Sequence, residues 1–439
     1  MRIFVIGSVV PFRRHGEPGV TAAHIVLSEL IGYLRLQGHD ITLQCLFHPS
    51  RAQRTLTSAE ETELELRRSD GMDVLPAVHP SEHVPPPQVE RFRLLKLALS
   101  SDKRLRHFAP ATTLRPMMEQ RILASKADAV LIVWSPEGVA ATHALKIPRV
   151  AYHGDVDPDV QHCRLRDRHV FDPDFCKRPF FRRTLQHIDQ TLRVALFRGT
   201  HGELMQGVDR IANITACNSA YYTRNGHPHS MYAGNVWVDT GAAALASPPS
   251  LEEPFQIIGH VGYLNRTGGT YGLRFLLEGV MPQLERAMGG RNYDVHVIGG
   301  GEIAKSLKPY LNQPHLKVRG FVPDLDAELM RCHAFYILSN AGCYQAAYTR
   351  HLVGWSAGLC VIAHDKSRLA IPEIRHGENA LLGRTPAEVA DAIALACTNA
   401  EMNHCVRRGG RETFLRHFTP KIVGGTVERE LRSATGKET

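Results

Sequence analysis

The sequence lacks long apolar segments and paired cysteines. It contains no run of about 18 consecutive apolar residues, the length that a membrane-spanning helix requires. Its nine cysteines are scattered, and no two of them form a Cys-x-x-Cys pair. We therefore expect no transmembrane segment, no zinc site and no disulfide framework. This cysteine pattern favours a reducing cytoplasm as the compartment.

The chain carries an excess of positive charge, with a formal net charge of +8 and a pI near 9.0. This balance favours an anionic partner, such as a nucleic acid, an anionic membrane surface or a phosphorylated substrate. No zinc-finger spacing and no RNA-reading aromatic motif accompanies the charge, so we expect no nucleic-acid partner. The length of 439 residues predicts two domains.

The first half of the chain has the pattern of a parallel α/β domain. Residues 2–6 form a short β-branched run that ends at Gly7, and a loop with Gly16 and Gly19 then opens an amphipathic helix. Further strands are predicted at 40–47, 128–134, 148–152 and 211–217. His153 stands at the C-terminal end of one of them, a position from which its side chain can reach a ligand.

The second half repeats this pattern of alternating strands and helices after a linker. Residues 242–254 are small, punctuated by proline and weakly patterned, which is typical of a connection between domains. Strands are then predicted at 256–261, 294–298, 316–321 and 334–338, with a helix at 303–311. This organisation predicts an α/β protein of two doubly wound domains that face each other across a cleft.

The stretch at 339–365 has the layout of an anion-binding unit. It opens with small residues after a strand, continues as a helix and closes on Gly358 before another apolar run. In such a unit, backbone N–H groups and the positive end of the helix point at the ligand. We interpret the stretch as the cradle of a nucleotide-sugar diphosphate.

Two other loops contain groups that suit the same ligand. Gly299, Gly300, Gly301 and Glu302 directly follow a strand, where glycines let backbone N–H groups approach a ligand closely. Turns of this kind also occur simply to pack a helix tightly against a strand. Arg266, in the loop after the first strand of the second half, offers a planar cation that matches a phosphate. A solvated loop arginine is the alternative.

Five phrases follow one another in the second half, namely GYLNRTGGTYGLRFLLEGVMPQL, VHVIGGGE, VRGFVPDLDAEL, GWSAGLCVIAH and IPEIRHGENALL. In this order they resemble the nucleotide-sugar-binding half of GT-B glycosyltransferases, especially bacterial members with the family-4 layout. The resemblance implies a GT-B fold with two Rossmann-like domains. It implies an acceptor-binding domain at 1–241, a nucleotide-sugar-binding domain at 255–417 and a C-terminal helix at 418–439 that returns to the first domain.

In the first half the resemblance is looser and holds at two places. The loop with Gly16 and Gly19 corresponds to the family's glycine loop near the acceptor. His153 matches a histidine that faces the donor sugar in this family, where imidazole can hydrogen-bond a sugar hydroxyl near neutral pH. The alternative is a strand-end histidine that is satisfied by backbone groups.

One feature departs from the family's pattern. Many retaining members carry two glutamates, one at the transferred sugar and one at the ribose, and their positions here are Gln345 and Val353. Valine cannot accept hydrogen bonds from ribose hydroxyls, and glutamine is neutral where a carboxylate is usual. Tyr348, Thr349 and Arg350 stand at the start of the helix, where Arg350 can pair with a diphosphate. The alternative for Arg350 is a surface helix residue.

The resemblance implies a glycosyltransferase that moves a sugar from a nucleotide-diphosphate sugar to a glycan, lipid-linked or other glycoconjugate acceptor. Its expected catalytic residues are His153 and Gln345. Its expected donor-binding residues are Arg266, Gly299, Gly300, Gly301, Glu302, Tyr348, Thr349 and Arg350, with backbone near Val322 along the base. No metal-binding motif stands out, so we expect metal-independent catalysis without a cofactor, by positioning and by stabilisation of the departing diphosphate.

Two basic segments, at 91–106 and 177–183, lie in the expected acceptor domain, and leucines are interleaved with the first. They suggest docking to an anionic membrane, at the inner face, or to a lipid-linked or lipopolysaccharide acceptor. A solvated helix face is the alternative.

Two other functions stay open on the sequence. One is a nucleotide-sugar 2-epimerase of the same fold, which a set of carboxylates and histidines around the sugar would favour. The other is a non-catalytic GT-B-like binding or scaffold protein, which the missing glutamate pair favours.

Overall fold

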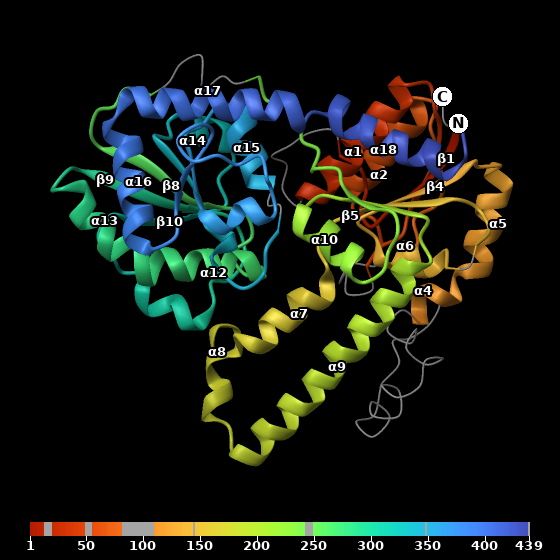
Figure 1. Cartoon of the computed structure of the whole chain (residues 1–439), viewed down its shortest axis with the longest axis horizontal. Helices are drawn as coiled ribbons and strands as arrows, with labels where there is room; N and C mark the ends of the chain where they lie inside the picture. The colour runs from red at the N-terminus through yellow and green to blue at the C-terminus, as the bar shows by residue number, and fades with distance from the viewer. Residues whose placement is uncertain are drawn as a thin grey trace. The chain divides into compact units, whose positions relative to one another are not determined.

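The computed structural model describes residues 1–12, 20–48, 55–80, 109–143, 145–241, 249–346 and 349–437 (Figure 1). The chain divides into two compact units. Unit 1 comprises residues 1–162, 184–236 and 420–439, and unit 2 comprises residues 163–183 and 237–419. The loop with Gly16 and Gly19, Tyr348 and the basic segment at 91–106 lie outside the described residues.

Unit 1 is built on a seven-stranded parallel sheet with the order β3-β2-β1-β4-β5-β6-β7. The strands are β1 (Arg2–Gly7), β2 (Asp40–Cys45), β3 (Asp73–Val74), β4 (Ala129–Val133), β5 (Arg149–His153), β6 (Arg210–Asn213) and β7 (Ser230–Tyr232). The central strands β1 and β4 are apolar along almost their whole length and are buried except at Arg2. This is the pattern of a parallel sheet that is covered on both faces.

Helices accompany the sheet of unit 1, and the longest of them has no buried residue before Leu196. They are α1 (Ala22–Leu36), α2 (Ser58–Ser69), α4 (Ala109–Thr113), α5 (Arg115–Ser125), α6 (Pro136–Ala141), α7 (Asp157–Arg166), α9 (Phe180–Gln206), α10 (Ala216–Arg224) and α18 (Pro420–Ala434). Helix α18 comes from the far end of the chain and packs on α1, where Tyr33 and His39 both contact the carboxylate of Glu428, at 3.2 Å and 3.0 Å. The C-terminal helix is therefore part of the first unit.

Unit 2 is built on a six-stranded parallel sheet with the order β10-β9-β8-β11-β12-β13. The strands are β8 (Phe255–Val261), β9 (Tyr293–Ile298), β10 (Leu316–Gly320), β11 (Ala334–Ile337), β12 (Val361–His364) and β13 (Leu381–Gly383). β8 lies between β9 and β11. The C-terminal ends of these three strands therefore meet at one edge of the sheet.

Helices also cover the sheet of unit 2. They include α12 (Thr267–Arg274), α13 (Met281–Met288), α14 (Leu325–Met330), α15 (Thr349–Ala357), α16 (Pro386–Thr398) and α17 (Ala400–His417). Helix α16 begins where Thr385 accepts the N–H of Glu388 and Pro386 takes the first position. Helix α15 ends directly before Gly358, whose φ of 72° is a conformation that glycine adopts without strain. The predicted class, two doubly wound α/β units, is confirmed.

One predicted helix is wrong in type and length. The sequence pattern predicts a helix at 303–311 that opens from the glycine turn, but the structure has the short 3₁₀ helix η5 (Lys305–Tyr310). Pro309 lies inside this segment and cannot donate the backbone hydrogen bond that an α-helix needs at that position. The glycine turn therefore receives no electrostatic help from an α-helix N-terminus.

Candidate functional site at the strand ends

The C-terminal edge of the sheet in unit 2 joins three loops. Gly262 follows β8, and its N–H donates to the carbonyl of Ile298 at 3.1 Å. The N–H of Leu264 donates to the carbonyl of Gly300 at 2.9 Å. The N–H of Gly299 donates to the carbonyl of Gly320 at 2.8 Å. The loops after β8, β9 and β10 are thus one hydrogen-bonded surface.

Gly299 and Gly301 are required by backbone geometry. Gly299 has φ of 143°, and a Cβ at this position would overlap the carbonyl oxygen of Gly262. Gly301 has φ of 95° and lies against the side chain of Asn265, whereas a Cβ on Gly300 would meet open space. Packing between two loops therefore accounts for the outer two glycines, and phosphate binding at this turn stays a prediction.

Arg350 lies at the same edge, in the first turn of α15. Its Nη1 donates to the hydroxyl of Ser339, which follows β11, at 2.5 Å. Its Nη2 lies 3.5 Å from the position that a Cβ on Gly262 would occupy. A cation in the first turn of a helix adds to the positive end of the helix dipole, which an anion stabilises. The structure thus brings Arg350 together with the loops after β8 and β11.

The structure also shows where the two positions of the missing glutamates lie. The side-chain amide of Gln345 donates to the carbonyls of Gly342 and Asn340, at 3.1 Å and 3.4 Å. Val353 is buried in α15, with 8% of its surface exposed. Neither residue supplies a carboxylate to this edge, as the sequence implies.

The remaining predicted donor residues are spread around this edge. Arg266 precedes α12 and is exposed, with its guanidinium over the ring of Tyr263 at 5.8 Å. Glu302 is exposed, and its carboxylate contacts Lys308 at 3.1 Å. Thr349 is the first residue of α15. Val322 is half-buried in the loop between β10 and α14. Binding roles for these residues stay predictions.

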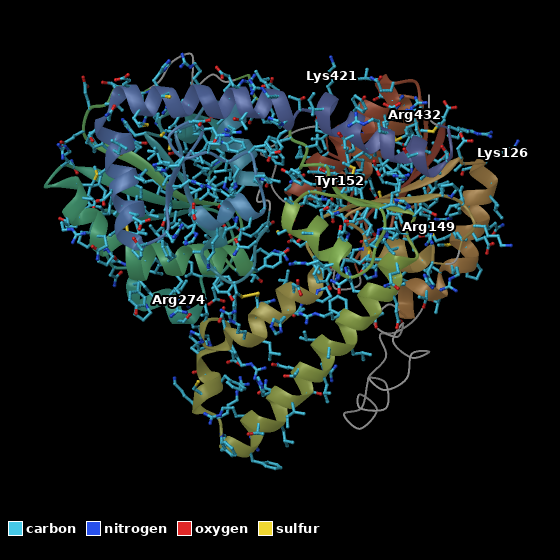
Figure 2. All side chains as sticks on the ribbon, in the orientation of Figure 1. Lys126, Arg149, Tyr152, Arg274, Lys421 and Arg432 are labelled. Atoms are coloured by element: carbon cyan, nitrogen blue, oxygen red, sulfur yellow. A yellow bond between two sulfur atoms is a disulfide. The ribbon has the colours of Figure 1, made fainter. Side chains whose placement is uncertain are left out.

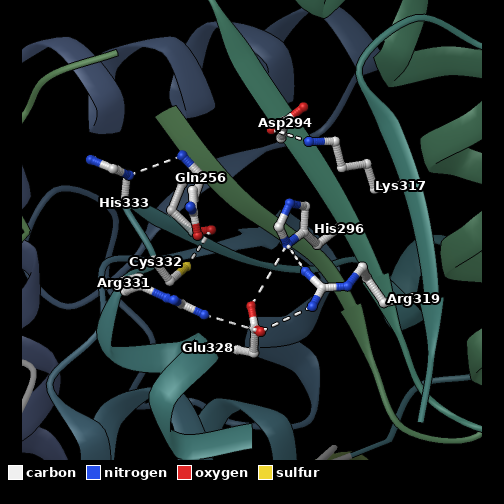
Figure 3. A network of polar contacts seen from close by, with 10 residues as sticks. Gln256, Asp294, His296, Lys317, Arg319, Glu328, Arg331, Cys332 and His333 are labelled. Atoms are coloured by element: carbon white, nitrogen blue, oxygen red, sulfur yellow. Dashed lines mark hydrogen bonds and ion pairs between the residues drawn. The ribbon is translucent and has the colours of Figure 1, made fainter. Parts of the chain in front are cut away.

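A polar network holds the loop that carries Val322. Figure 3 shows the carboxylate of Glu328, on α14, between Arg319 on β10 and Arg331, at 3.2 Å and 3.1 Å. His296 on β9 lies 3.9 Å from the same carboxylate, and burial lowers its pKa, with the charge of Arg319 acting in the same direction. The network fixes β10 and α14 on either side of this loop.

Residues 163–183 add a segment to unit 2 that the sequence did not predict. The hydroxyl of Tyr271, on α12, contacts the carboxylate of Asp167 at 2.5 Å and the carbonyl of Cys163 at 3.3 Å. A disulfide joins Cys163 to Cys343, in the loop that also carries Gln345 (Figure 2). A cavity of about 400 Å³ lies between this segment, α12 and the loop. The scattered cysteines gave no spacing signal for this pair.

In unit 1, His153 ends β5 and is buried, with 3% of its surface exposed. Its ring lies 5.6 Å from that of His201 and 5.7 Å from that of Tyr222, between ring centroids. Burial lowers the pKa of His153 to about 4. The imidazole is therefore neutral at pH 7. In this state it can form hydrogen bonds, but it cannot act as an acid in the imidazolium form.

Two carboxyl groups near His153 were missed by the sequence analysis. Burial raises the pKa of Glu137, at the start of α6, to about 7. Burial, together with the charges of Asp155 and Glu137, raises the pKa of Asp157 to about 7. The available signal was their position directly after the strands at 128–134 and 148–152, and the Asp-Val-Asp sequence of residues 155–157.

No cluster of three or more potential metal ligands occurs among the described residues.

Two doubly wound parallel units, with the last helix returning to the first unit, define the GT-B fold. Comparison with protein families adds that residues 256–399 match the family model described as "Glycosyl transferases group 1". The matched residues include the edge with the glycine turn and Arg350. A comparison with curated protein sequences finds no match.

Solved structures with the same fold cover the whole chain. They include a glycosyltransferase from Rickettsia africae (TM-score 0.59, 10% identity, 100% of this chain and 99% of that one). They also include α,α-trehalose 6-phosphate synthase from Burkholderia multivorans (TM-score 0.60, 12% identity, 99% and 97%). A third is HepE from Anabaena in complex with UDP (TM-score 0.57, 13% identity, 98% and 99%). At these identities the similarity concerns the fold.

No helix in the described part of the chain is long and apolar enough to cross a bilayer.

Proposed function

We propose that the chain is a glycosyltransferase that moves a sugar from a nucleoside-diphosphate sugar to a hydroxyl of a glycan, lipid-linked or other glycoconjugate acceptor. The observation that carries the proposal is the position of Arg350 within the residues that match the family model. Arg350 contacts Ser339 and lies beside Gly262, where the strand ends of a parallel sheet offer backbone groups to a ligand.

The diphosphate is proposed to bind between Arg350 and the loops that follow β8 and β9. A guanidinium forms two parallel hydrogen bonds with phosphate oxygens, and these are stronger than bonds between neutral groups. As the bond to the sugar breaks, negative charge grows on the leaving diphosphate, and a fixed cation stabilises that charge. Arg350 can supply this stabilisation itself, so we propose that the reaction needs no metal ion and survives treatment with EDTA.

Thermal unfolding of the full chain with a panel of nucleoside diphosphates tests the proposal. We expect at least one of UDP, GDP, ADP, CDP and dTDP to raise the melting temperature, because a ligand that binds the folded state stabilises it by mass action. Arg350→Ala should abolish most of the shift. Arg286→Ala, which removes an exposed arginine on α13, should leave it unchanged. No shift with any nucleotide at millimolar concentration would contradict the proposal.

The start of α9 supports a membrane-associated acceptor as part of this proposal. Phe180 and Phe181 are 74% and 72% exposed, and Leu185 and Ile188 continue the stripe at 43% and 50%. The spacing of Phe181, Leu185 and Ile188 places them on one face of the helix. Four cations flank the stripe, Lys177, Arg178, Arg182 and Arg183. Exposed aromatics among cations are typical of a segment that lies in an anionic membrane interface. We therefore propose a membrane-associated acceptor, on the cytoplasmic side.

Sedimentation with vesicles tests this part of the proposal. Binding to vesicles that contain phosphatidylglycerol should exceed binding to pure phosphatidylcholine vesicles and should decrease with salt. The double change Phe181→Ser and Leu185→Ser should weaken binding by at least about tenfold, because each buried side chain contributes about 1.5–3 kcal/mol. Leu123→Ser, on a helix of unit 1 and 70% exposed, is the matched control. Equal binding by all three proteins would exclude this segment as the contact.

One specific observation supports the scaffold function as a second candidate. Gln345 and Val353 leave the two glutamate positions of the family without a carboxylate, so the protein could bind a nucleotide without transferring its sugar. Release of UDP from a UDP-sugar distinguishes the two functions, because a scaffold binds the nucleotide and releases no product.

A further inference from the structure

The disulfide between Cys163 and Cys343 ties two distant parts of unit 2 together. Cys163 belongs to α7 and Cys343 to the loop after β11, 180 positions later, and both lie in unit 2. Their Cα atoms are 6.1 Å apart, within the range that a disulfide bridges. The bond therefore joins the segment at 163–183 to the loop that carries Gln345.

The same segment is also held by contacts that do not involve sulfur. Oγ of Ser306 donates to the carbonyl of Val170 at 2.9 Å. The rings of Phe171 and Tyr271 meet edge to face, with 5.3 Å between their centroids. The segment is thus placed beside unit 2 by packing and hydrogen bonds, and the disulfide adds a covalent tie to them.

This disulfide is isolated in the chain. The other seven cysteines form no disulfide within the described structure. A chain of this kind has the cysteine usage of a reducing compartment, where disulfides are transient and serve catalysis or redox sensing. The bond is therefore better explained as a reversible one than as part of a stabilising framework.

The two sulfur atoms differ in their access to small molecules. Cys163 is 6% exposed, whereas Cys343 is half-buried and lines the cavity of about 400 Å³. A cavity of this size suits a small molecule. Thiol–disulfide exchange begins when a thiolate attacks one of the two sulfurs, and access influences which sulfur is attacked. A small thiol can therefore reach Cys343 through the cavity, with Cys163 as the leaving group.

The charges in the cavity favour an anion. Its lining contains the three cations Arg166, Arg274 and Lys366, and the two carboxylates Asp167 and Glu278. Asp167 lies 3.6 Å from Arg166, and Glu278 lies 2.9 Å from Arg274. Both carboxylates are thus matched by an arginine, and Lys366 supplies the excess of positive charge.

Lys366 places this charge beside the disulfide. Its Nζ lies 3.4 Å from the carbonyl of Gly342, the residue that precedes Cys343. Within the part of the chain that the structure describes, this ammonium forms no ion pair with a carboxylate. A positive charge at this position attracts the thiolate form of a thiol, which is the nucleophile, and any further anionic group on the same molecule.

We propose that the cavity is a thiol–disulfide exchange site for a low-molecular-mass thiol that carries negative charge, and that Cys343 is the sulfur attacked. Exchange at Cys343 releases the loop that carries Gln345 from the segment at 163–183. This inference is independent of the proposed transferase function.

The exchange balances in atoms and electrons. The thiolate of the small thiol forms a bond to Sγ of Cys343, and the disulfide bond breaks. Its electron pair leaves with Sγ of Cys163, which takes a proton from water. A second molecule of the small thiol attacks the first in the mixed disulfide and releases Cys343 as a thiolate. In total, two small thiols are oxidised to their disulfide and the two cysteines are reduced.

Peptide mapping by mass spectrometry tests the bond and the point of attack. After oxidation of the full chain with diamide, we expect a linked pair of peptides that contains Cys163 and Cys343. A short treatment with 2-mercaptoethanesulfonate, followed by an acid quench, should leave the mixed disulfide on Cys343. A lack of the linked pair, or a mixed disulfide on Cys163 instead of Cys343, would overturn the inference.

Exchange rates with thiols of different charge test the class of ligand. Lys366→Gln should lower the rate with anionic 2-mercaptoethanesulfonate severalfold, and it should leave the rate with neutral 2-mercaptoethanol unchanged. High salt should reduce this difference, because it screens the charge of Lys366. Lys317→Gln is the matched control, since Lys317 is exposed on β10, at the other end of the strand order of the same sheet. Equal rates for the wild type and Lys366→Gln with the anionic thiol would overturn the assignment of an anionic ligand.

Hydrogen–deuterium exchange tests the release of the loop. In the wild type, amides at 163–171 and 340–346 should exchange faster after reduction than in the oxidised chain. Cys343→Ser should show the fast pattern under both conditions. Cys176→Ser, which changes an exposed cysteine outside the disulfide, should behave like the wild type. Identical exchange in the oxidised and reduced wild type would overturn the release of the loop. None of these readouts requires a nucleotide, so they separate this inference from the proposed function.

Discussion

The strand-end edges of the two units have the same architecture and opposite chemistry. In unit 2 the edge combines glycine loops with Arg350, and it offers backbone N–H groups and positive charge. In unit 1 the edge combines Trp134, Glu137 and His153, and it offers carboxylates, a neutral imidazole and an aromatic face. A parallel sheet positions its strand ends in the same way in both units. The chemical difference between the two edges therefore lies in their loops and not in their sheets.

The two edges also differ in the reason why particular residues occupy them. Gly299 is required by the carbonyl of Gly262, so its identity is explained by packing alone. Glu137 and Trp134 have the reverse character, because the burial of Oε2 of Glu137 and the left-handed φ of Trp134 are costly to the fold. Packing therefore explains the glycine in unit 2, and it does not explain the buried polar atoms in unit 1.

The largest expected effect concerns the glycine turn. Gly299→Ala should lower the free energy of unfolding by at least about 2 kcal/mol, because it adds a clash with Gly262 and a strained φ. Thermal unfolding should show this as a decrease in melting temperature of several degrees. Gly300→Ala places its Cβ in open space and serves as the control, with little change in melting temperature. Equal melting temperatures for the two variants would contradict the packing explanation.

The second effect separates the two arginines of the donor edge. Arg350→Ala should weaken UDP binding by about 1.5–3 kcal/mol, the range for hydrogen bonds to charged groups. Arg266→Ala should cost less than about 1 kcal/mol, because Arg266 is exposed and solvent screens its charge. Calorimetric titration with UDP measures both. A larger loss in Arg266→Ala would assign the main diphosphate contact to the loop after β8.

The third effect is a dependence of stability on pH in unit 1. The pKa of Glu137 is raised from 4.5 to about 7 in the folded chain, so its protonated form is the stable one there. Its contribution to stability is fully present below pH 4.5 and is lost as the pH rises through 7. Glu137→Gln removes this group. The difference in free energy of unfolding between the variant and the wild type should therefore be more favourable to the variant at pH 8 than at pH 4.5, by on the order of 2 kcal/mol.

Urea unfolding of both proteins at the two pH values measures this difference. His153 and His201 act in the opposite direction, since burial lowers their pKa to about 4 and about 3 and they lose stability as the pH falls below 6.5. Comparison of Glu137→Gln with the wild type at each pH cancels their contribution. An identical difference at both pH values would show that the pKa of Glu137 is not raised in the folded chain.

The sequence predicted the fold because its signals are local. The apolar run at residues 3–6 indicates a buried strand. Gly358 indicates where the preceding helix ends. The sequence also placed Arg350 near the donor loops, through its order relative to that phrase. It could not predict the contacts of Tyr271 and Cys343 with the segment at 163–183, because these join residues more than 100 positions apart.

Burial was the other quantity that local patterns did not report. His153 was predicted from its place after a strand, but its neutral state is due to burial, and the rings packed beside it belong to His201 and Tyr222 on later helices. Glu137 looks in sequence like an ordinary acidic residue in the first turn of a helix, where it would stabilise the helix dipole. Its buried, unpaired oxygen becomes visible when the sheet is assembled.

The central claim is that the diphosphate binds at the edge of unit 2 and not at that of unit 1. Hydrogen–deuterium exchange of the full chain, with and without UDP, tests it most directly, because amides that bind a ligand exchange more slowly. We predict slower exchange at 262–269, 299–304 and 349–353, and unchanged exchange at 134–139 and 153–158. Slower exchange at the latter two segments with none at the first three would contradict the account.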